Sequence, residues 1–515
     1  MKRWAVIALL LLWLGWHLAT SIALETADVG RHIKNGELLL KGTGDILYKN
    51  YYSYTHQNYS FINHHWLFGV FCYAAWHYLG FAGLSFIYLL LELLSFYLFF
   101  LLAERFSNLK FAYIFALFSI PSLVTRAEIR PEGFSMLFCG LFWVLLNSYQ
   151  GQRLTSNYLK IALALLQVLW VNTHIFFFMG PLLTALFWCQ LRMNGQSQQA
   201  KALKETLWVV IGTCLINPSG FWGALTPLNI FKGLNGSLIE NQSIFILPHI
   251  AIGKVYFYYL FVLLGIMILP WIFLVKREGF KKHVFMLSLT FFMSIGAFGA
   301  IRLLSPWAFF MIPVSAYAWG RWSETWPKTL QRTVLSALLI YGIWASGVVN
   351  FNWKHDPTMG LQPGVNRSAQ FFKQAGLQGP IFNNYDIGGY LIFHLSPPMK
   401  FFVDNRLEAF PKEFFSKEYL PMLYDENMWQ AMEGKYHFNV IYFSQNDGNA
   451  YARLFLLKRL RDPLWAVVFA DDFVLIFLKR NAQNKDLIER YQWTTSRVKL
   501  PDNTWGYKLD RGLKI

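Results

Sequence analysis

Cysteine is scarce in this chain, with four residues in 515: Cys72, Cys139, Cys189 and Cys214. All four lie inside or beside hydrophobic runs and none occurs after residue 214, so the sequence offers neither a disulfide framework nor a set of thiolates for zinc. The redox state of the compartment therefore stays open. Nucleotide-binding loops are missing too, since the chain contains neither a Walker sequence nor a dinucleotide fingerprint.

Charged residues are also few, at 15% of the chain, whereas 55% is hydrophobic and 18% aromatic, and the mean hydropathy is +0.32. A soluble globular chain does not have this composition, so we expect a polytopic membrane protein with the lipid bilayer as a partner. The net charge of +17 does not indicate a nucleic-acid partner. The reason is that the basic residues lie between hydrophobic runs and do not form one stripe.

Apolar runs long enough for a hydrocarbon core of about 30 Å predict about eleven spans. The first is Trp4 to Leu24, retained as an anchor although Ser21-Ile22-Ala23 could serve as a signal cleavage site. The others are about 82–102, 111–124, 133–149, 159–171, 175–191, 206–217, 250–275, 284–300, 303–320 and 331–349. Lys2 and Arg3 hold the N-terminus in the cytoplasm, and an odd span number leaves the C-terminus outside. Phe61 to Leu79 is predicted as an interfacial helix, because counting it as a span would place the later basic loops outside.

The composition changes near residue 350 and divides the chain into two expected domains. Residues 1–349 form the transmembrane domain, with an outer loop at 25–64 and the interfacial helix near 61–79. Residues 350–515 form a soluble extracytoplasmic α/β domain. Its predicted strands are 380–382, 400–403, 439–443, 465–469 and 473–477, the last two forming a hairpin, and its predicted helices are 366–376, 412–432 and 450–461. Asp386 to Tyr390 reads as a turn that needs glycine dihedrals.

The most polar segment beside an apolar run is Glu25 to His32. Charged side chains at the end of a membrane span are costly and indicate a function. A spacing of three places Glu25 and Asp28 on one face of a helix. Two structural interpretations of Asp28 stay open: it caps a helix that runs to about Leu40, or it pairs with Arg31.

A divalent cation is a further hypothesis for this segment. Glu25, Asp28 and His32, together with His64 or His65, would form a suitable set of oxygen and nitrogen ligands, although no spacing motif supports it. The two adjacent histidines are alternatively interfacial anchors beside Trp66.

Other polar clusters also fall on the outer side of the membrane under this topology. They are Tyr52 to Thr55, Asn63 to Trp66, Arg126 to Glu132, Asn172 to His174, Asn217-Pro218 and Arg302. This distribution favours a surface-facing active site over a transport path through the bilayer midplane. The alternatives are that Arg130 and Arg302 reach lipid headgroups or pair with Glu132, and that His174 is a polar helix end. Glu92 lies alone in the middle of a span.

The order of these features resembles the GT-C membrane glycosyltransferases. Asp28-Val29-Gly30-Arg31-His32-Ile33 with Gly36-Glu37, Tyr52-Ser53-Tyr54-Thr55 and His65-Trp66-Leu67 are similar to bacterial GT-C-like proteins, and more distantly to protein mannosyltransferases and aminoarabinose transferases. Arg130-Pro131-Glu132 and Phe402 to Arg406 look like further shared landmarks, and Asp404 and Arg406 form either a structural ion pair or an acceptor contact. The sharpest matches span about forty residues, whereas the topology covers the whole chain.

The resemblance implies transfer of a sugar from a polyprenyl-phosphate donor to a glycan, lipid or protein acceptor at the outer face, and a bacterial inner membrane with a periplasmic C-terminal domain. Asp28 matches the position of the family's catalytic carboxylate. Relatives often carry an Asp-Glu pair there, whereas Glu25 and Asp28 are three residues apart, so either is a candidate base. Arg130 and Arg302 are candidates for the donor phosphate. The candidate substrate-binding residues are His32, His64, His65, Glu132 and His174.

Two other functions remain open at this stage. A transporter or flippase of lipid-linked glycans would need polar residues along a path through the bilayer, and Glu92 is the one residue that hints at such a path. A non-catalytic scaffold with the same fold would bind glycans or proteins through residues 350–515. No cofactor is predicted beyond the divalent cation raised above.

Overall fold

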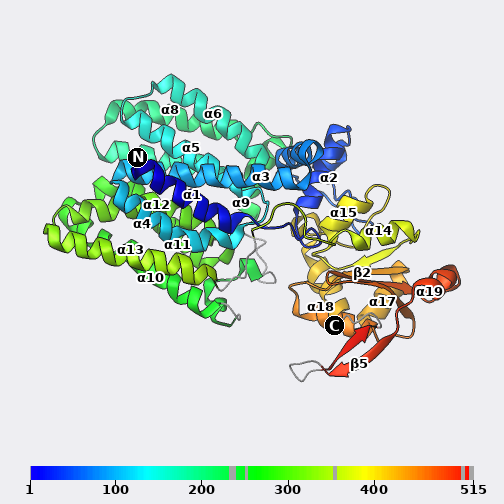
Figure 1. Ribbon diagram of the computed structural model, residues 1–515. Helices are drawn as coiled ribbons and strands as arrows, with labels where there is room; N and C mark the ends of the chain where they lie inside the picture. The colour runs from blue at the N-terminus through cyan, green and yellow to red at the C-terminus, as the bar shows by residue number, and fades with distance from the viewer. Residues whose placement is uncertain (1, 231–238, 250–252, 352–356, 500–504, 510–515) are drawn as a thin grey trace. The chain divides into compact units, whose positions relative to one another are not determined.

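The structure is a computed structural model, in which residues 2–230, 239–249, 253–351, 357–499 and 505–509 are described (Figure 1). Contacts between residues in the folded chain divide it into two compact units. Residues 1–21 and 82–359 form one, here called the helical unit, and residues 22–81 and 360–515 form the other, here called the mixed unit. The segment expected to be an outer loop and interfacial helix therefore belongs with the C-terminal residues.

The helical unit consists of long apolar helices. They are α1 (Lys2–Leu18), the second half of α3 (Trp66–Phe106), α4 (Leu109–Leu123), α5 (Glu132–Gln150), α6 (Ser156–Thr173), α7 (Met179–Met193), α8 (Ser197–Thr213), α9 (Gly220–Ile230), α10 (Gly253–Glu278), α11 (Val284–Gly299), α12 (Leu304–Ser323) and α13 (Lys328–Phe351). Short 3-10 turns occur between them, including η4 (Ile239–Asn241) and η7 (Ile301–Leu303). The first helix ends at Leu18, before the predicted limit of Leu24.

Six helical segments in the described part of the chain are long and apolar enough to cross a membrane. They are Trp66–Phe106, Leu109–Arg126, Ile175–Met193, Lys254–Glu278, Phe280–Gly299 and Ile301–Ser323. The protein is therefore a multi-pass membrane protein. The predicted count of about eleven spans is not confirmed, because helices such as α1 are short and others such as α6 carry polar residues along their length.

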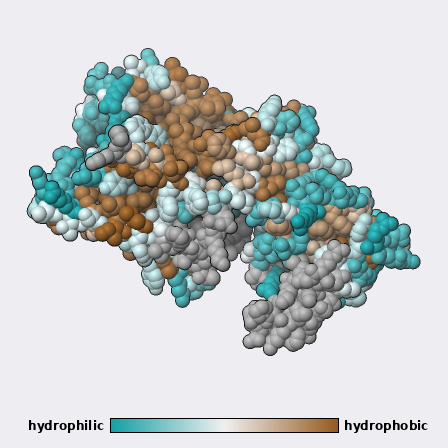
Figure 2. Space-filling view, viewed as in Figure 1, coloured by the Kyte–Doolittle hydropathy of each residue, from teal (hydrophilic) through white to brown (hydrophobic). Residues whose placement is uncertain are grey.

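Helix α12 is buried along most of its length and packs on α4, so these two helices form the centre of the helical unit. The outside of the unit is apolar as well. Figure 2 shows apolar side chains over much of the surface of the helical unit, and Leu9, Leu12, Trp208 and Ile340 are more than half exposed. Helices that are apolar on both faces are typical of a membrane environment.

The mixed unit contains a four-stranded sheet with helices around it. Its elements are α2 (Val29–Leu40), the first half of α3, α14 (Arg367–Gln374), β1 (Ile381–Asn383), α15 (Gly388–Leu395), α16 (Leu420–Tyr424), α17 (Glu426–Tyr436), β2 (Val440–Ser444), α18 (Ala450–Arg459), β3 (Trp465–Ala470), β4 (Val474–Lys479) and α19 (Lys485–Tyr491). A separate hairpin follows, formed by β5 (Thr495–Lys499) and β6 (Trp505–Leu509).

The sheet has the order β1-β2-β4-β3, with β1 parallel to β2 and the other neighbours antiparallel. The structure confirms four of the predicted strands, which are β1 to β4, and the predicted hairpin of β3 and β4. It also confirms the three predicted helical regions. The predicted strand 400–403 is wrong. Those residues form one isolated bridge, Ser53 to Phe401, because the partner segment has an irregular backbone.

Backbone hydrogen bonds join residues 22–54 to the C-terminal part of the mixed unit. The amide of Ile22 donates to the carbonyl of Gly360 at 2.7 Å, and the amide of Phe401 donates to the carbonyl of Tyr52 at 2.8 Å. Tyr54 returns a bond to the carbonyl of Phe401 at 3.1 Å. These bonds satisfy backbone groups of both segments, which explains why the loop and the later residues form one unit.

Close backbone approaches at glycines hold α2 in place. A Cβ atom on Gly36 would lie 2.2 Å from the carbonyl oxygen of Gly69, which is on α3. A Cβ on Gly30 would lie 2.9 Å from the carbonyl oxygen of Gly389, and a Cβ on Gly388 would lie 2.4 Å from the Cα of Asp404. The prediction that Asp386 to Tyr390 form a turn with glycine dihedrals is wrong. Gly388 and Gly389 begin α15 and have no positive φ, and they are needed because other backbone packs closely against them.

The helix α3 starts at Trp66, not at the predicted Phe61, and Gly80 interrupts it with a φ of 67°. Only glycine adopts this conformation without strain. The interruption lies one residue before the last residue of the mixed unit, Phe81. Residues 66–79 are therefore a separate helical segment, and their location at the membrane interface stays a prediction.

We predict that Gly36→Ala destabilises the protein, because the added methyl group overlaps the carbonyl of Gly69. Overpacking of this kind costs about 1–3 kcal/mol. Gly44→Ala is the matched control, since a Cβ at Gly44 meets no atom within 4 Å. The apparent melting temperature of the purified protein should fall for Gly36→Ala and stay close to that of wild type for Gly44→Ala. Equal values for both variants would show that α2 does not depend on this contact.

Candidate functional site

Asp28 is held by two polar neighbours within the mixed unit. Its Oδ1 accepts a hydrogen bond from the Asn405 amide and lies 3.4 Å from the Arg31 guanidinium. Asn405 in turn accepts from Arg31 Nε at 3.0 Å, so the three side chains orient one another. The predicted pair with Arg31 is confirmed. Asp28 also occupies the N-cap position of α2, but its side chain makes no capping hydrogen bond. With 26% of the side chain exposed, the carboxylate is both oriented and accessible.

Glu25, the second candidate base, has a different environment. The residue is 2% exposed, its Oε1 accepts from Asn446 Nδ2 at 3.4 Å, and its Oε2 has no hydrogen-bond partner in the described structure. Burial raises the pKa of Glu25, although hydrogen bonds from its own backbone amide and from Asn446 act in the opposite direction. Of the two acids, Asp28 is therefore the one whose carboxyl group is both paired with an arginine and partly open to solvent.

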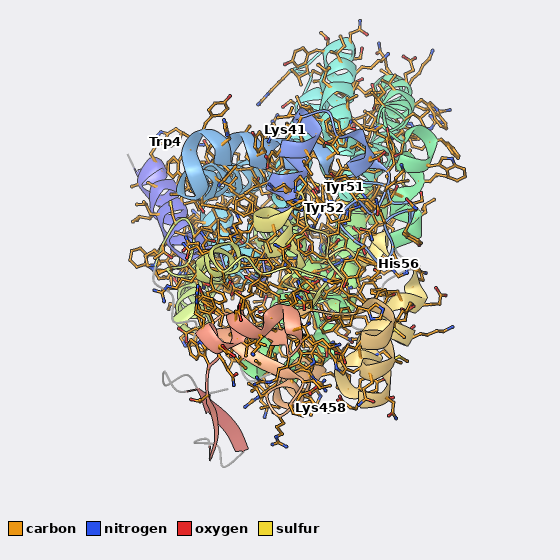
Figure 3. All side chains as sticks on the ribbon, turned by 90° about the vertical axis from the view of Figure 1, so that its right-hand side faces the viewer. Trp4, Lys41, Tyr51, Tyr52, His56 and Lys458 are labelled. Carbon is orange, nitrogen blue, oxygen red and sulfur yellow. The ribbon has the colours of Figure 1, made fainter. Side chains whose placement is uncertain are left out.

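A buried ion pair lies next to Asn405 in the sequence. Arg406 donates to Asp404 through Nε at 2.7 Å and through Nη2 at 2.6 Å, and both residues are 1% exposed. Arg406 also donates to Asn50 Oδ1 at 2.8 Å and lies over the ring of Tyr52, which Figure 3 labels beside Tyr51. The structural interpretation of this pair is confirmed. The pair fixes the backbone on both sides of Asn405 and so indirectly fixes the partner of Asp28.

Three of the predicted substrate-binding histidines form one cluster in the mixed unit. The ring centroids of His32 and His65 are 5.8 Å apart, and those of His64 and His65 are 4.1 Å apart. His64 is buried, which lowers its pKa and favours the neutral ring. Across the described residues, no group of three or more His, Cys, Asp and Glu side chains is arranged to hold a metal ion. The cation hypothesis thus has no preformed ligand set to support it.

A pocket in the helical unit contains the predicted phosphate-binding residues. It is lined by Tyr88, Glu92, Arg126, Arg130, Glu132, Gly133, Met136, Arg302, Ser305, Pro306 and Phe309, and it is partly open to solvent. Helix α5 begins at Glu132, which lines the pocket, and helix α12 begins at Leu304, next to the lining residue Ser305. Helix N-termini carry partial positive charge, so two helix dipoles and three arginines favour an anion here.

The arginines of this pocket differ in how they are paired. Arg126 binds Glu132 at 3.0 Å and Glu240 of η4 at 2.7 Å. Arg130 binds Glu128 at 2.6 Å and Glu240 at 3.2 Å. Arg302 makes no ion pair within 4.0 Å to any residue that the structure describes. An incoming anion would therefore find its uncompensated positive charge at Arg302.

His174 does not line this pocket. It follows the last residue of α6, its Nδ1 is 2.7 Å from Ser135 Oγ, and Trp170 donates to the same hydroxyl at 2.8 Å. The residue is 4% exposed. This environment agrees with the alternative that His174 is a polar helix end.

The structure brings together some predicted residues and adds others. Arg130, Arg302 and Glu132 share one pocket of the helical unit, whereas Glu25, Asp28, His32, His64 and His65 all belong to the mixed unit. Sequence reasoning did not place Arg126, Glu92 or Asn405 among the residues of the site. A charge inside an apolar run was the available signal for Glu92, and the Phe402 to Arg406 landmark was the signal for Asn405. Arg126 lies four residues before Arg130, at the end of a short 3-10 turn.

Comparisons with known proteins establish the fold. No protein-family model and no curated protein matches the chain. Solved structures do match: an archaeal oligosaccharyltransferase, AglB from Archaeoglobus fulgidus in complex with an inhibitory peptide and a dolichol-phosphate, gives a TM-score of 0.59 at 11% identity over 98% of this chain and 74% of that one.

Two further structures have the same architecture. ArnT from Cupriavidus metallidurans bound to undecaprenyl phosphate gives a TM-score of 0.50 at 11% identity over 92% of this chain and 97% of that one. The arabinofuranosyltransferase AftD from Mycobacteria gives 0.54 at 11% identity over 93% of this chain and 41% of that one. The chain is thus similar in structure to GT-C glycosyltransferases and has the GT-C fold with a small C-terminal α/β part, as predicted.

We predict opposite pH dependences for two glutamates of the mixed unit, the buried Glu25 and the half-buried Glu37. A raised pKa at Glu25 destabilises the fold increasingly as the pH rises above the ordinary value of 4.5, so Glu25→Gln should raise the melting temperature at pH 8 and change it little at pH 4.5. At Glu37, burial is outweighed by Lys34 and Lys41, which lower the pKa, so Glu37→Gln should lower the melting temperature at pH 8. Thermal unfolding at both pH values tests this. Identical pH profiles for the two variants would contradict it.

Proposed function

We propose that this protein is a glycosyltransferase that moves a sugar from a polyprenyl-phosphate donor to an acceptor at the extracytoplasmic face of the membrane. The observation that carries the proposal is the pocket of the helical unit, where the N-termini of α5 and α12 meet Arg126, Arg130 and Arg302. A site of this charge suits a phosphate, and its position in a unit of membrane helices suits a phosphate attached to a lipid.

The known structures with this fold support a donor of this class. AglB was solved with a dolichol-phosphate and ArnT with undecaprenyl phosphate, and both are polyprenyl phosphates. The bacterial inner membrane, with the mixed unit in the periplasm, is the location that we propose for this chain. The acceptor is a glycan, a lipid or a protein.

The proposed reaction breaks the bond between the anomeric carbon of the sugar and the phosphate oxygen. An acceptor hydroxyl attacks that carbon from the opposite side, so the anomeric centre inverts, and the hydroxyl proton passes to a carboxylate. The bonding electrons leave with the oxygen, and polyprenyl phosphate is released with its negative charge. Cations beside this phosphate lower the barrier, because the charge on the leaving oxygen grows in the transition state.

Asp28 is the base that we propose. Its carboxylate is oriented by Asn405 and Arg31 and is partly exposed, whereas Glu25 is buried and has a raised pKa that disfavours its ionised form. Arg302 is the proposed main phosphate ligand, since it has no ion pair among the described residues. Arg130 is the second, held in position by Glu128 and Glu240.

Release of polyprenyl phosphate in proteoliposomes, from a panel of polyprenyl-phosphate sugars with cell-envelope acceptors, tests the proposal. Asp28→Asn should lower turnover by about 10²–10⁴-fold, because it removes the proton acceptor at constant size. Arg302→Gln should lower turnover by about 10²–10³-fold. Arg332→Gln, at an exposed arginine of α13, is the matched control and should keep wild-type turnover. Each reaction is run with EDTA and with added Mg²⁺ or Mn²⁺ to test the divalent cation.

The outcomes separate the candidate residues and functions. Full turnover of Asp28→Asn together with loss in Glu25→Gln would make Glu25 the base. Loss in Arg332→Gln as large as in Arg302→Gln would remove the phosphate role of Arg302. Wild-type protein that moves the intact lipid-linked sugar across the bilayer without releasing polyprenyl phosphate would contradict a transferase and favour a flippase.

A further inference from the structure

Glu92 lies where a carboxylate is costly, in the middle of the apolar helix α3. The structure places its side chain in the lining of the pocket, together with Arg302 and the first residues of α5. It therefore faces the proposed donor site. Glu92 was the only hint in the sequence of a transport path through the bilayer. Its position in the pocket explains this residue without such a path.

Two neighbours define the position of this carboxylate. A Cβ atom on Gly133 would lie 2.3 Å from Glu92 Oε1 and 2.6 Å from the Tyr88 hydroxyl oxygen, so the absence of a side chain at Gly133 makes room for both groups. Tyr88 donates to the carbonyl oxygen of Arg130 at 2.8 Å and so joins α3 to the segment before α5. The carboxylate consequently lies against the first turn of α5, next to the residues that bind an anion.

Glu92 is not simply the counter-charge of an arginine. The neighbouring carboxylates are all in ion pairs: Glu132 and Glu240 with Arg126, at 3.0 Å and 2.7 Å, and Glu128 with Arg130, at 2.6 Å. Glu92 has no ion pair within 4.0 Å to the residues that the structure describes. Its carboxyl group shares a hydrogen bond with Tyr88 and lines the pocket, so it is placed to hydrogen-bond a hydroxyl group of a ligand.

We propose that Glu92 binds hydroxyl groups of the sugar on the donor lipid and so contributes to the choice of that sugar. The inference rests on the proposed function and deepens it, by dividing the pocket into a phosphate part at Arg302 and a sugar part at Glu92. A carboxylate accepts hydrogen bonds from hydroxyl groups through two oxygens, which makes it suited to neighbouring hydroxyls of one sugar ring.

The remaining lining fits a glycosyl phosphate. Met136, Pro306 and Phe309 supply apolar surface for the carbon face of a sugar or for the first isoprene unit.

Equilibrium binding to the full-length protein in detergent tests this division. The probes are farnesyl phosphate and farnesyl phosphates that carry glucose, mannose, galactose, arabinose or 4-amino-arabinose, titrated by calorimetry. We expect wild-type protein to bind at least one glycosylated probe about tenfold more tightly than farnesyl phosphate. Glu92→Gln should erase that preference and leave the affinity for farnesyl phosphate within about twofold, because a lost charge-assisted hydrogen bond costs about a factor of ten.

Two further variants keep the test specific. Glu104→Gln lies on the same helix, where Glu104 pairs with Arg3 at 2.7 Å, and it should bind every probe like wild type. Gly133→Ala leaves Glu92 in the sequence but displaces its carboxylate, so it should lose the same preference as Glu92→Gln. Melting temperatures of all variants identify any that fail to fold.

The possible results either support or overturn the inference. A glycosylated probe preferred equally by wild type and Glu92→Gln would overturn it, as would equal losses for farnesyl phosphate and for the glycosylated probes. Wild-type protein that binds farnesyl phosphate through Arg302 but prefers no glycosylated probe would overturn the inference and leave the phosphate site. Wild-type protein that binds none of the probes would overturn the proposed function itself.

Discussion

The structure depends on positive charge that is kept in an apolar environment. In the helical unit, α5 and α12 begin at the same pocket, and Arg126, Arg130 and Arg302 add three cations to the two helix N-termini. Such charge is stable between membrane helices only where it is compensated. Glu132, Glu240 and Glu128 form ion pairs with Arg126 and Arg130, whereas Arg302 has no ion pair among the described residues. We therefore propose that a phosphate completes the pocket at Arg302.

The mixed unit follows a different principle, in which glycines and buried polar pairs position one exposed carboxylate. The loop after α1 is joined by backbone hydrogen bonds to the segment around Phe401, and glycine contacts press α2 against α3 and α15. The buried pair of Asp404 and Arg406 holds the backbone beside Asn405, which binds Asp28. Rigid support of this kind allows a carboxylate to act as a base without reorganisation.

Much of the fold was predictable because hydropathy and turn signals are local. The long apolar runs, the change near residue 350, the hairpin of β3 and β4 and the helix that ends at Leu40 all follow from short-range patterns. The partners of the site residues were not predictable in this way. Asn405 lies 377 residues after Asp28, and Glu240 lies 114 residues after Arg126, so no spacing rule connects them. The glycines at 388 and 389 were recognised but assigned to a turn, since only the folded structure shows the backbone that lies against them.

The central claim is that the pocket at Arg302 binds the phosphate of a polyprenyl phosphate. Photolabelling tests it most directly, with an undecaprenyl phosphate analogue that carries a diazirine next to the phosphate, followed by mass spectrometry of the labelled peptides. The account predicts labels within residues 126–136 and 301–309 and a strong loss of labelling in Arg302→Gln. Labels confined to other parts of the chain, or labelling of these two segments that is unchanged in Arg302→Gln, would contradict it.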